Sequence, residues 1–241
     1  METSQNKERI AKVLARAGVA SRRGVERMIA DGRITLKDKP VTSPATFIAG
    51  TEEIKVDGKT IARSEKTRLW MYHKPRGLVT THYDPGGRPT VFENLPKEIP
   101  RVISVGRLDI NTEGVLLLTN DGGLARFLEL PSSGIKRKYR VRVHGIVKAE
   151  DLKKLADGVT VNRINYGPII AKLEKVQGSN AWIAMVLTEG KNREIKNVLG
   201  HLGLRVTRLI RTQFGPFSLR NSKPNEIIEI SSKQIQKLWS P

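Results

Sequence analysis

Hydrophobic residues in the first part of the chain repeat at helical spacing and then at strand spacing. Residues 10–17 put apolar side chains at the i, i+3, i+4 and i+7 positions of one helical face. A second helix is predicted between Ser21, a residue type that caps helix N-termini, and Gly32, which suits the left-handed position after a helix. Short strands are expected at 34–36 and 53–57, and the turn after the first of them lacks the usual glycine.

The remainder of the chain is richer in strands, after a polar stretch at 63–67 that we interpret as a linker. Strands are expected at 69–73, 78–81, 102–105, 115–118, 138–143, 169–176, 182–187, 206–210 and 227–230. Helices are expected at 123–130, 149–156 and 192–202, with a closing amphipathic helix after the last strand. The turn at Pro75-Arg76-Gly77 predicts that the first two of these strands form a hairpin.

Helices and strands are mixed irregularly, without the regular strand–helix–strand alternation that accompanies a parallel sheet. This order favours an α+β fold on a largely antiparallel sheet. The change of pattern near the polar stretch predicts two domains, a small one at 7–65 and a larger one at 68–241.

The composition indicates a globular protein with a polyanionic partner. Hydrophobic residues make up 38% of the 241 residues, enough to bury a core. Lys and Arg number 43 against 24 Asp and Glu, a net charge of +19, and both predicted domains are positive. This excess favours nucleic acid, because neutralised phosphates release condensed counterions.

Other classes of protein are disfavoured by the same sequence. The start of the chain is polar, and no apolar run approaches the roughly 20 residues that span a bilayer, so we expect no membrane partner. The sequence has no cysteine, which excludes a disulfide framework and thiolate chemistry. We therefore expect a cytoplasmic protein.

The two N-terminal helices carry a basic face away from their apolar stripes. Its members are Arg9, Lys12, Arg16, Arg22, Arg23, Arg27 and Arg33. A charged face of this kind can be simple solvated surface. However, the stretch from Arg9 through Ser21-Arg22-Arg23 to Asp31-Gly32-Arg33-Ile34 resembles the S4 RNA-binding domain. The resemblance implies that the basic face contacts an RNA backbone.

A polar turn at 106–114 separates two apolar strands and contains a candidate nucleophile. Asp109 stands in this turn, where a carboxylate would be held in a rigid and partly desolvated position. From loop chemistry alone, the simpler interpretation is a turn-forming aspartate that is hydrogen-bonded to its own backbone.

Four spaced motifs favour the catalytic interpretation by resemblance. They are Gly106-Arg107-Leu108-Asp109-Ile110-Asn111-Thr112-Glu113-Gly114 with its continuation to Gly122, His73-Lys74-Pro75-Arg76-Gly77, Lys138-Tyr139, and Glu189-Gly190-Lys191-Asn192-Arg193-Glu194-Ile195-Lys196. Together with the S4-like stretch they resemble the RsuA/RluB-type pseudouridine synthases over essentially the whole chain. The resemblance implies isomerisation of a uridine in RNA, a reaction that needs neither a metal nor an organic cofactor.

The resemblance also implies roles for individual side chains. Asp109 would be the nucleophile, Lys196 the cation that keeps it ionised, and Tyr139 the ring that stacks on the flipped uracil. Arg107 is expected to help orient the carboxylate, because lysine lacks the bidentate fork of arginine. Without the motifs, Tyr139 would be interpreted as a core aromatic residue and Lys196 as a solvated helix residue. Further RNA contacts are expected from Lys74, Arg76, Arg137, Arg140, Arg142 and Arg193.

Within the family, residues 109–112 and 192–196 are more similar to the RluB branch, so we expect a substrate uridine in large-subunit ribosomal RNA. Two alternatives stay open: the same chemistry on small-subunit or transfer RNA, and a non-catalytic S4 protein that helps to fold ribosomal RNA. Many RluB-like proteins continue into a long basic tail, whereas this chain stops at Pro241. We therefore expect the S4 module to contribute more to site selection, and we expect a monomer by default.

Overall fold

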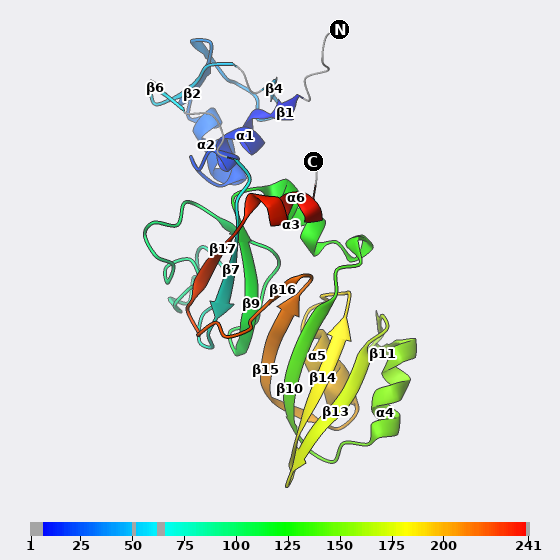
Figure 1. Ribbon diagram of the computed structural model, residues 1–241. Helices are drawn as coiled ribbons and strands as arrows, with labels where there is room; N and C mark the ends of the chain where they lie inside the picture. The colour runs from blue at the N-terminus through cyan, green and yellow to red at the C-terminus, as the bar shows by residue number, and fades with distance from the viewer. Residues whose placement is uncertain (1–6, 50–51, 62–65, 240–241) are drawn as a thin grey trace. The chain divides into compact units, whose positions relative to one another are not determined.

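The computed structural model describes residues 7–49, 52–61 and 66–239, and the chain forms two compact units (Figure 1). The first unit contains the chain up to Thr67 and the short segments 100–102 and 120–122. The second contains 68–99, 103–119 and 123–241. The linker expected at 63–67 lies mostly outside the described residues. No helix within the described ranges is long and apolar enough to cross a membrane.

A helix pair and short strands form the first unit. Its elements are β1 (Glu8–Arg9), α1 (Ile10–Arg16), α2 (Arg22–Ala30), β2 (Ile34–Leu36), β3 (Lys39–Pro40), β4 (Phe47–Ile48), β5 (Ile54–Val56) and β6 (Lys59–Thr60). Strands β3, β2, β5 and β6 form one antiparallel sheet in that order, and β1 pairs with β4. The predicted cap of α2 is present, because Ser21 Oγ accepts a hydrogen bond from the backbone N–H of Gly24 at 3.0 Å.

Apolar residues from both helices and the sheet close a small core in the first unit. Ile10, Leu14 and Val25 are fully buried against Ile34 and Ile48. The turn between β2 and β3 lacks glycine because Lys37 and Asp38 themselves adopt the left-handed conformation, with φ of 50° and 62°. The short strands β1, β3, β4 and β6 were not predicted, because two-residue strands carry no periodic signal.

The second unit is built on one large mixed sheet. Its strands are β7 (Leu69–Lys74), β8 (Ile103–Ser104), β9 (Thr112–Thr119), β10 (Arg137–His144), β13 (Ile170–Gln177), β14 (Asn180–Leu187), β15 (Arg205–Phe214), β16 (Phe217–Ser218) and β17 (Ile227–Ile230). The order along the sheet is β13-β14-β10-β15-β9-β7-β17, with β8 beside β9 and β16 beside β15. All these pairs are antiparallel except β15 with β9. The α+β fold with a largely antiparallel sheet is therefore confirmed.

Helices cover the sheet in two groups and create two hydrophobic cores. They are α3 (Gly122–Glu129), α4 (Ala149–Lys154), α5 (Glu194–His201) and α6 (Ser232–Leu238), with short 3-10 turns at Pro131–Ser133 and Leu155–Asp157. Helices α4 and α5 pack on β10 and β14, and α5 lies behind these strands in Figure 1. Helices α3 and α6 pack on β7 and β9. A separate hairpin, β11 (Val159–Val161) with β12 (Ile164–Tyr166), was not predicted.

The hairpin predicted around Pro75-Arg76-Gly77 is wrong. Strand β7 pairs with β9 on one side and β17 on the other, so it has no free edge for residues 78–81. Those residues lead instead into a long loop, with a single isolated bridge between Val79 and Thr90. The turn residues were recognised correctly, but local sequence does not specify which strand pairs with which.

Candidate active site

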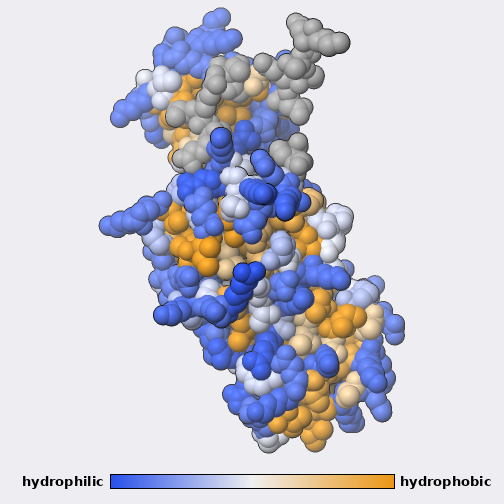
Figure 2. All heavy atoms as spheres, in the orientation of Figure 1, coloured by the Kyte–Doolittle hydropathy of each residue, from blue (hydrophilic) through white to orange (hydrophobic). Residues whose placement is uncertain are grey.

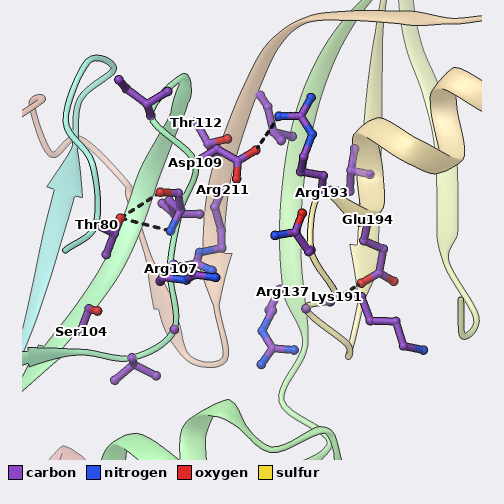
Figure 3. A pocket seen from close by; sticks show the side chains of 18 of the residues that line it. Thr80, Ser104, Arg107, Asp109, Thr112, Arg137, Lys191, Arg193, Glu194 and Arg211 are labelled. Atoms are coloured by element: carbon purple, nitrogen blue, oxygen red, sulfur yellow. Dashed lines mark hydrogen bonds and ion pairs between the residues drawn. The ribbon is translucent and has the colours of Figure 1, made fainter. Parts of the chain in front are cut away.

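The loop between β8 and β9 holds Asp109 through several backbone contacts. The hydroxyl of Thr80 donates to the carbonyl of Leu108 at 2.9 Å and accepts from its N–H at 3.3 Å, as Figure 3 shows. The carbonyl of Asp109 accepts a hydrogen bond from the N–H of Thr112 at 2.9 Å. The backbone on both sides of the carboxylate is therefore fixed before any substrate binds.

A buried lysine completes this support. Lys74, at the end of β7, is fully buried, and its ammonium donates to the carbonyls of Pro75 (2.9 Å), Asp109 (3.3 Å), Ile110 (3.4 Å) and Thr112 (3.0 Å). Burial lowers the pKa of Lys74 to about 8, an effect partly offset by the negative charges of Asp109 and Glu113. The expected RNA contact by Lys74 is therefore wrong, because this side chain is buried and binds the backbone of the loop that carries Asp109.

The carboxylate of Asp109 meets two cations from the start of α5. Its Oδ2 atom lies 2.6 Å from Lys196 Nζ and 3.8 Å from the guanidinium of Arg193, an ion pair drawn in Figure 3. The side chain of Asp109 is 35% exposed and that of Lys196 is 18% exposed. The ion pair is therefore only partly screened by solvent.

The position of Arg193 corrects the role expected for Arg107. Arg107 is exposed and lines the same pocket, but among the described residues it forms no ion pair with Asp109. Arg193 supplies the second cation instead, from the residue before α5, where its φ of 51° is left-handed. The sequence alone did not show whether Arg107 or Arg193 would lie near the carboxylate, because both are arginines in the motifs.

Asp109 opens onto a pocket of about 1040 Å³, at the upper end of the volumes usual for ligand sites. Tyr139 of β10 lies in its wall together with Leu187 of β14 and Leu209 of β15. The lining also includes residues of the loops at 79–88 and 189–193, many of them polar or charged. The pocket therefore combines an apolar, partly aromatic surface with a carboxylate and several cations.

Three arginines that were expected to hold phosphates around the pocket are either buried or face away from it. Arg137 lines the pocket but is buried, donating to the carbonyls of Thr188 and, at 3.0 Å, Glu129; burial lowers its pKa. Arg140 and Arg142 alternate with Tyr139 along β10 and so point to the other face of the sheet. That face carries both hydrophilic and hydrophobic side chains in the lower part of Figure 2. Arg140 pairs there with Glu174 at 2.7 Å.

Two buried charged residues in the pocket wall were missed at the level of sequence. Glu194 begins α5 and accepts a hydrogen bond from the N–H of Lys191 at 2.9 Å, while burial raises its pKa. Arg211 of β15 donates through Nε to the carbonyl of Val115 at 2.7 Å. Glu194 stands within a quoted motif, so it could have been singled out; Arg211 gives no local signal beyond its charge.

A glycine brings β9 and β15 together beside this site. Gly114 has φ of 110°, and a Cβ added to it would lie 2.2 Å from the carbonyl oxygen of Arg211. The parallel contact between the two strands therefore requires glycine at position 114.

The basic face expected on α1 and α2 divides into two groups. Arg22, Arg23 and Arg27 are exposed and form no ion pair with another described residue. The others have partners: Arg9 lies over the Phe47 ring, Lys12 and Arg16 pair with Glu8, and Arg33 pairs with Asp57. Arg76 is exposed but does not line the pocket, so its RNA contact stays a prediction.

Comparison with known proteins agrees with these observations. Residues 68–201 match the RNA pseudouridylate synthase family, and residues 8–54 match the S4 domain. The chain is 47% identical over 233 residues to an uncharacterised RNA pseudouridine synthase of Rickettsia felis, covering 95% of this chain and 100% of the relative. It is 43% identical over 226 residues to the ribosomal large subunit pseudouridine synthase B of Pasteurella multocida, covering 90% and 65% of the two chains.

A solved structure supports the fold over nearly the full length. The crystal structure of a pseudouridylate synthase superimposes with a TM-score of 0.66 at 24% sequence identity, covering 96% of this chain and 99% of the other. That likeness concerns the fold; the activity class and the RNA-binding module are established by the two family matches, the first of which covers more than half of the chain. The chain belongs to the RsuA/RluB-type RNA pseudouridine synthases, isomerases that carry an N-terminal S4 domain.

Proposed function

We propose that this enzyme converts a uridine of large-subunit ribosomal RNA to pseudouridine, with Asp109 as its nucleophile. The substrate class is supported by relatives in Pasteurella multocida (43% identical) and Xanthomonas campestris (39% identical), both named ribosomal large subunit pseudouridine synthase B. The strongly basic composition, +19 overall, is consistent with a large folded RNA as substrate.

The reaction rearranges bonds without net oxidation or hydrolysis. The bond between ribose C1′ and N1 of uracil breaks, the base turns, and a new bond forms between C1′ and C5. The hydrogen on C5 leaves as a proton, and N1 ends protonated. A carboxylate that attacks either the ribose or the base keeps that fragment bonded to the enzyme while the base turns in the pocket.

Lys196 supports this role of Asp109 electrostatically. Its ammonium lies 2.6 Å from one carboxylate oxygen, Oδ2, and Arg193 approaches the same oxygen at 3.8 Å. Both contacts engage Oδ2, and the side chain remains accessible from the pocket. Lys74 and Thr80 hold the backbone of the loop, so little reorganisation is needed when substrate arrives.

Tyr139 provides a surface for the extruded base. Its ring lies in the pocket wall beside Leu187 and Leu209, which gives the uracil an apolar and aromatic contact after it leaves the helical stack. Such a contact offsets part of the unstacking cost, which is a few kcal/mol for base flipping. Tyr139 also belongs to the core cluster under α5, so packing fixes the ring in place.

The single observation that carries the proposal is the Asp109–Lys196 ion pair on the wall of a pocket that also contains Tyr139. The test incubates the purified chain with unmodified large-subunit and small-subunit ribosomal RNA, followed by mapping of pseudouridine. We expect one product site in the large-subunit RNA for wild type and none for Asp109→Asn. Product only in small-subunit RNA would refute the substrate, and product formed by Asp109→Asn would refute the nucleophile.

A further inference from the structure

Tyr83 is the most exposed aromatic side chain of the catalytic unit among the described residues. It is 77% exposed and lines the mouth of the catalytic pocket. Exposing a large ring costs free energy, because its apolar surface stays in water. The Tyr83 hydroxyl forms no hydrogen bond with any described residue, so the ring is not retained there by a polar contact within the protein.

The loop under Tyr83 is held in shape by its own contacts. The Thr81 hydroxyl donates to the carbonyl of Tyr83 at 2.8 Å and accepts from its N–H at 3.3 Å. On the other side, Asp84 accepts two hydrogen bonds from the side chain of Arg88, at 2.7 and 3.0 Å, and one from its backbone N–H at 3.0 Å. These contacts lower the pKa of Asp84 to about 2, so the pair stays ionised at all working pH values.

The same loop is anchored to the nucleophile. Thr80, three residues before Tyr83, bonds both backbone groups of Leu108, the residue before Asp109. Further along the loop, His82 stacks on Phe92 with ring centroids 3.6 Å apart. Tyr83 is therefore carried at a defined position relative to Asp109 by a rigid loop, and is not on a free tip.

An RNA substrate supplies a complementary surface at this place. When a uridine leaves its stack to reach Tyr139, the neighbouring base loses a stacking partner and exposes one face. A ring held at the pocket mouth can cover that face, and stacking tolerates any base because every base has a π surface. Tyr139 is buried in the pocket wall, where it can stack on the target base, so Tyr83 is available to stack on the adjacent base.

We propose that Tyr83 forms a stacking subsite at the pocket mouth for an unstacked nucleobase adjacent to the target uridine, an inference that rests on the proposed function. The subsite fixes the register of the RNA strand at the pocket and takes no part in the chemistry. Tyr83 is thus a positioning residue whose effect appears in the RNA concentration needed for half-maximal rate.

The test compares Tyr83→Ala and Tyr83→Phe with wild type in single-turnover reactions on unmodified ribosomal RNA. Loss of one base–aromatic stack should raise the half-saturating concentration about 10-fold for Tyr83→Ala. The rate at saturation should fall less than about twofold, because the subsite does not touch the reacting atoms. Tyr83→Phe should retain most of the affinity, because its ring can stack and the hydroxyl is not needed.

A matched control is Ile146→Ala, which removes an 87% exposed apolar side chain of the same unit that does not line the pocket. It should behave as wild type. A direct readout places 2-aminopurine next to the mapped uridine in a stem-loop RNA; its fluorescence should be quenched by wild type and not by Tyr83→Ala.

The stacking subsite and the proposed substrate can fail independently, and the experiment distinguishes the two failures. If wild type forms no pseudouridine in either ribosomal RNA, the proposed substrate is wrong, and equilibrium binding of the same RNAs to wild type and Tyr83→Ala then decides the subsite. Unchanged half-saturation and binding for Tyr83→Ala would overturn the proposal. Equal losses for Tyr83→Ala and Tyr83→Phe would also overturn it, because they would indicate a hydrogen bond and not stacking.

Discussion

Replacing Lys74 by methionine tests whether the buried ammonium positions the loop that carries Asp109. Lys74→Met keeps a side chain of similar length and removes the donor to four carbonyl oxygens. The contacts to Pro75 and Thr112 are short, at 2.9 and 3.0 Å, whereas those to Asp109 and Ile110 are longer, at 3.3 and 3.4 Å. We count the two short contacts as full hydrogen bonds and the longer two as supporting electrostatic contacts.

The expected change in stability is modest because two effects oppose each other. Two buried carbonyls that lose their donor cost about 1–3 kcal/mol each. Removing the ammonium also removes its desolvation penalty, which corresponds to the lowering of the pKa of Lys74 from 10.5 to about 8. At 1.36 kcal/mol per pKa unit, and reduced for residual solvent, this relief is about 2–3 kcal/mol. Lys74→Met should therefore lower the free energy of unfolding by about 1–2 kcal/mol, and by about 4 kcal/mol at most.

The expected change in activity is larger. Without the ammonium the backbone at residues 109–112 can relax, and a displacement of about 1 Å of a reacting group can cost about 100-fold in rate. The assay is the single-turnover release of tritium from C5 of uridine in RNA at saturating enzyme, alongside urea unfolding. The control is Lys153→Met, which alters an exposed lysine of α4. A rate for Lys74→Met within about threefold of wild type would refute the positioning role of this residue.

Three further expectations follow from the same structure. Lys196→Met should lower the single-turnover rate about 10- to 100-fold, because a charged hydrogen bond contributes about 1.5–3 kcal/mol, and Lys196→Arg should lose less. In the S4 domain, Arg22, Arg23 and Arg27 are exposed, and changing all three to glutamine should weaken the salt dependence of RNA binding. The slope of log affinity against log salt concentration should fall by about 2–3, since each phosphate contact contributes about 0.7–0.9. An unchanged slope would mean that these arginines do not touch RNA. Between pH 8 and 10.5, Lys74 binds a proton in the unfolded chain but not in the folded one, because burial lowers its pKa to about 8. The free energy of unfolding of wild type should therefore rise with pH in this range relative to that of Lys74→Met. Urea unfolding at several pH values measures this difference, and the absence of a rise would contradict the burial of the charge.

Much of the fold could be predicted from local patterns. The alternation along β10, with Tyr139, Val141 and Val143 buried, and the cap at Ser21 were visible in the sequence and are present. Pairing was not predictable in the same way. The parallel contact of β9 with β15 joins residues nearly a hundred positions apart, and the sequence of neither strand indicates which strand it pairs with.

The candidate site shows the same division between chemistry and placement. The residue types and motifs singled out Asp109 and Lys196, which the fold brings together across 87 positions. Burial was harder to predict, because a basic side chain looks alike in sequence whether it faces RNA or the interior. Lys74 stands at the end of a fully buried strand and turns inward, and Arg140 and Arg142 face away from the pocket because β-strand side chains alternate.

The most direct test of the catalytic role of Asp109 is the measurement of pseudouridine formed by Asp109→Asn on ribosomal RNA that wild type modifies. The amide has nearly the shape of the carboxylate but cannot act as the anionic nucleophile, so binding should persist within a few-fold while product falls below detection. Pseudouridine formed by Asp109→Asn at a rate near that of wild type would contradict the account.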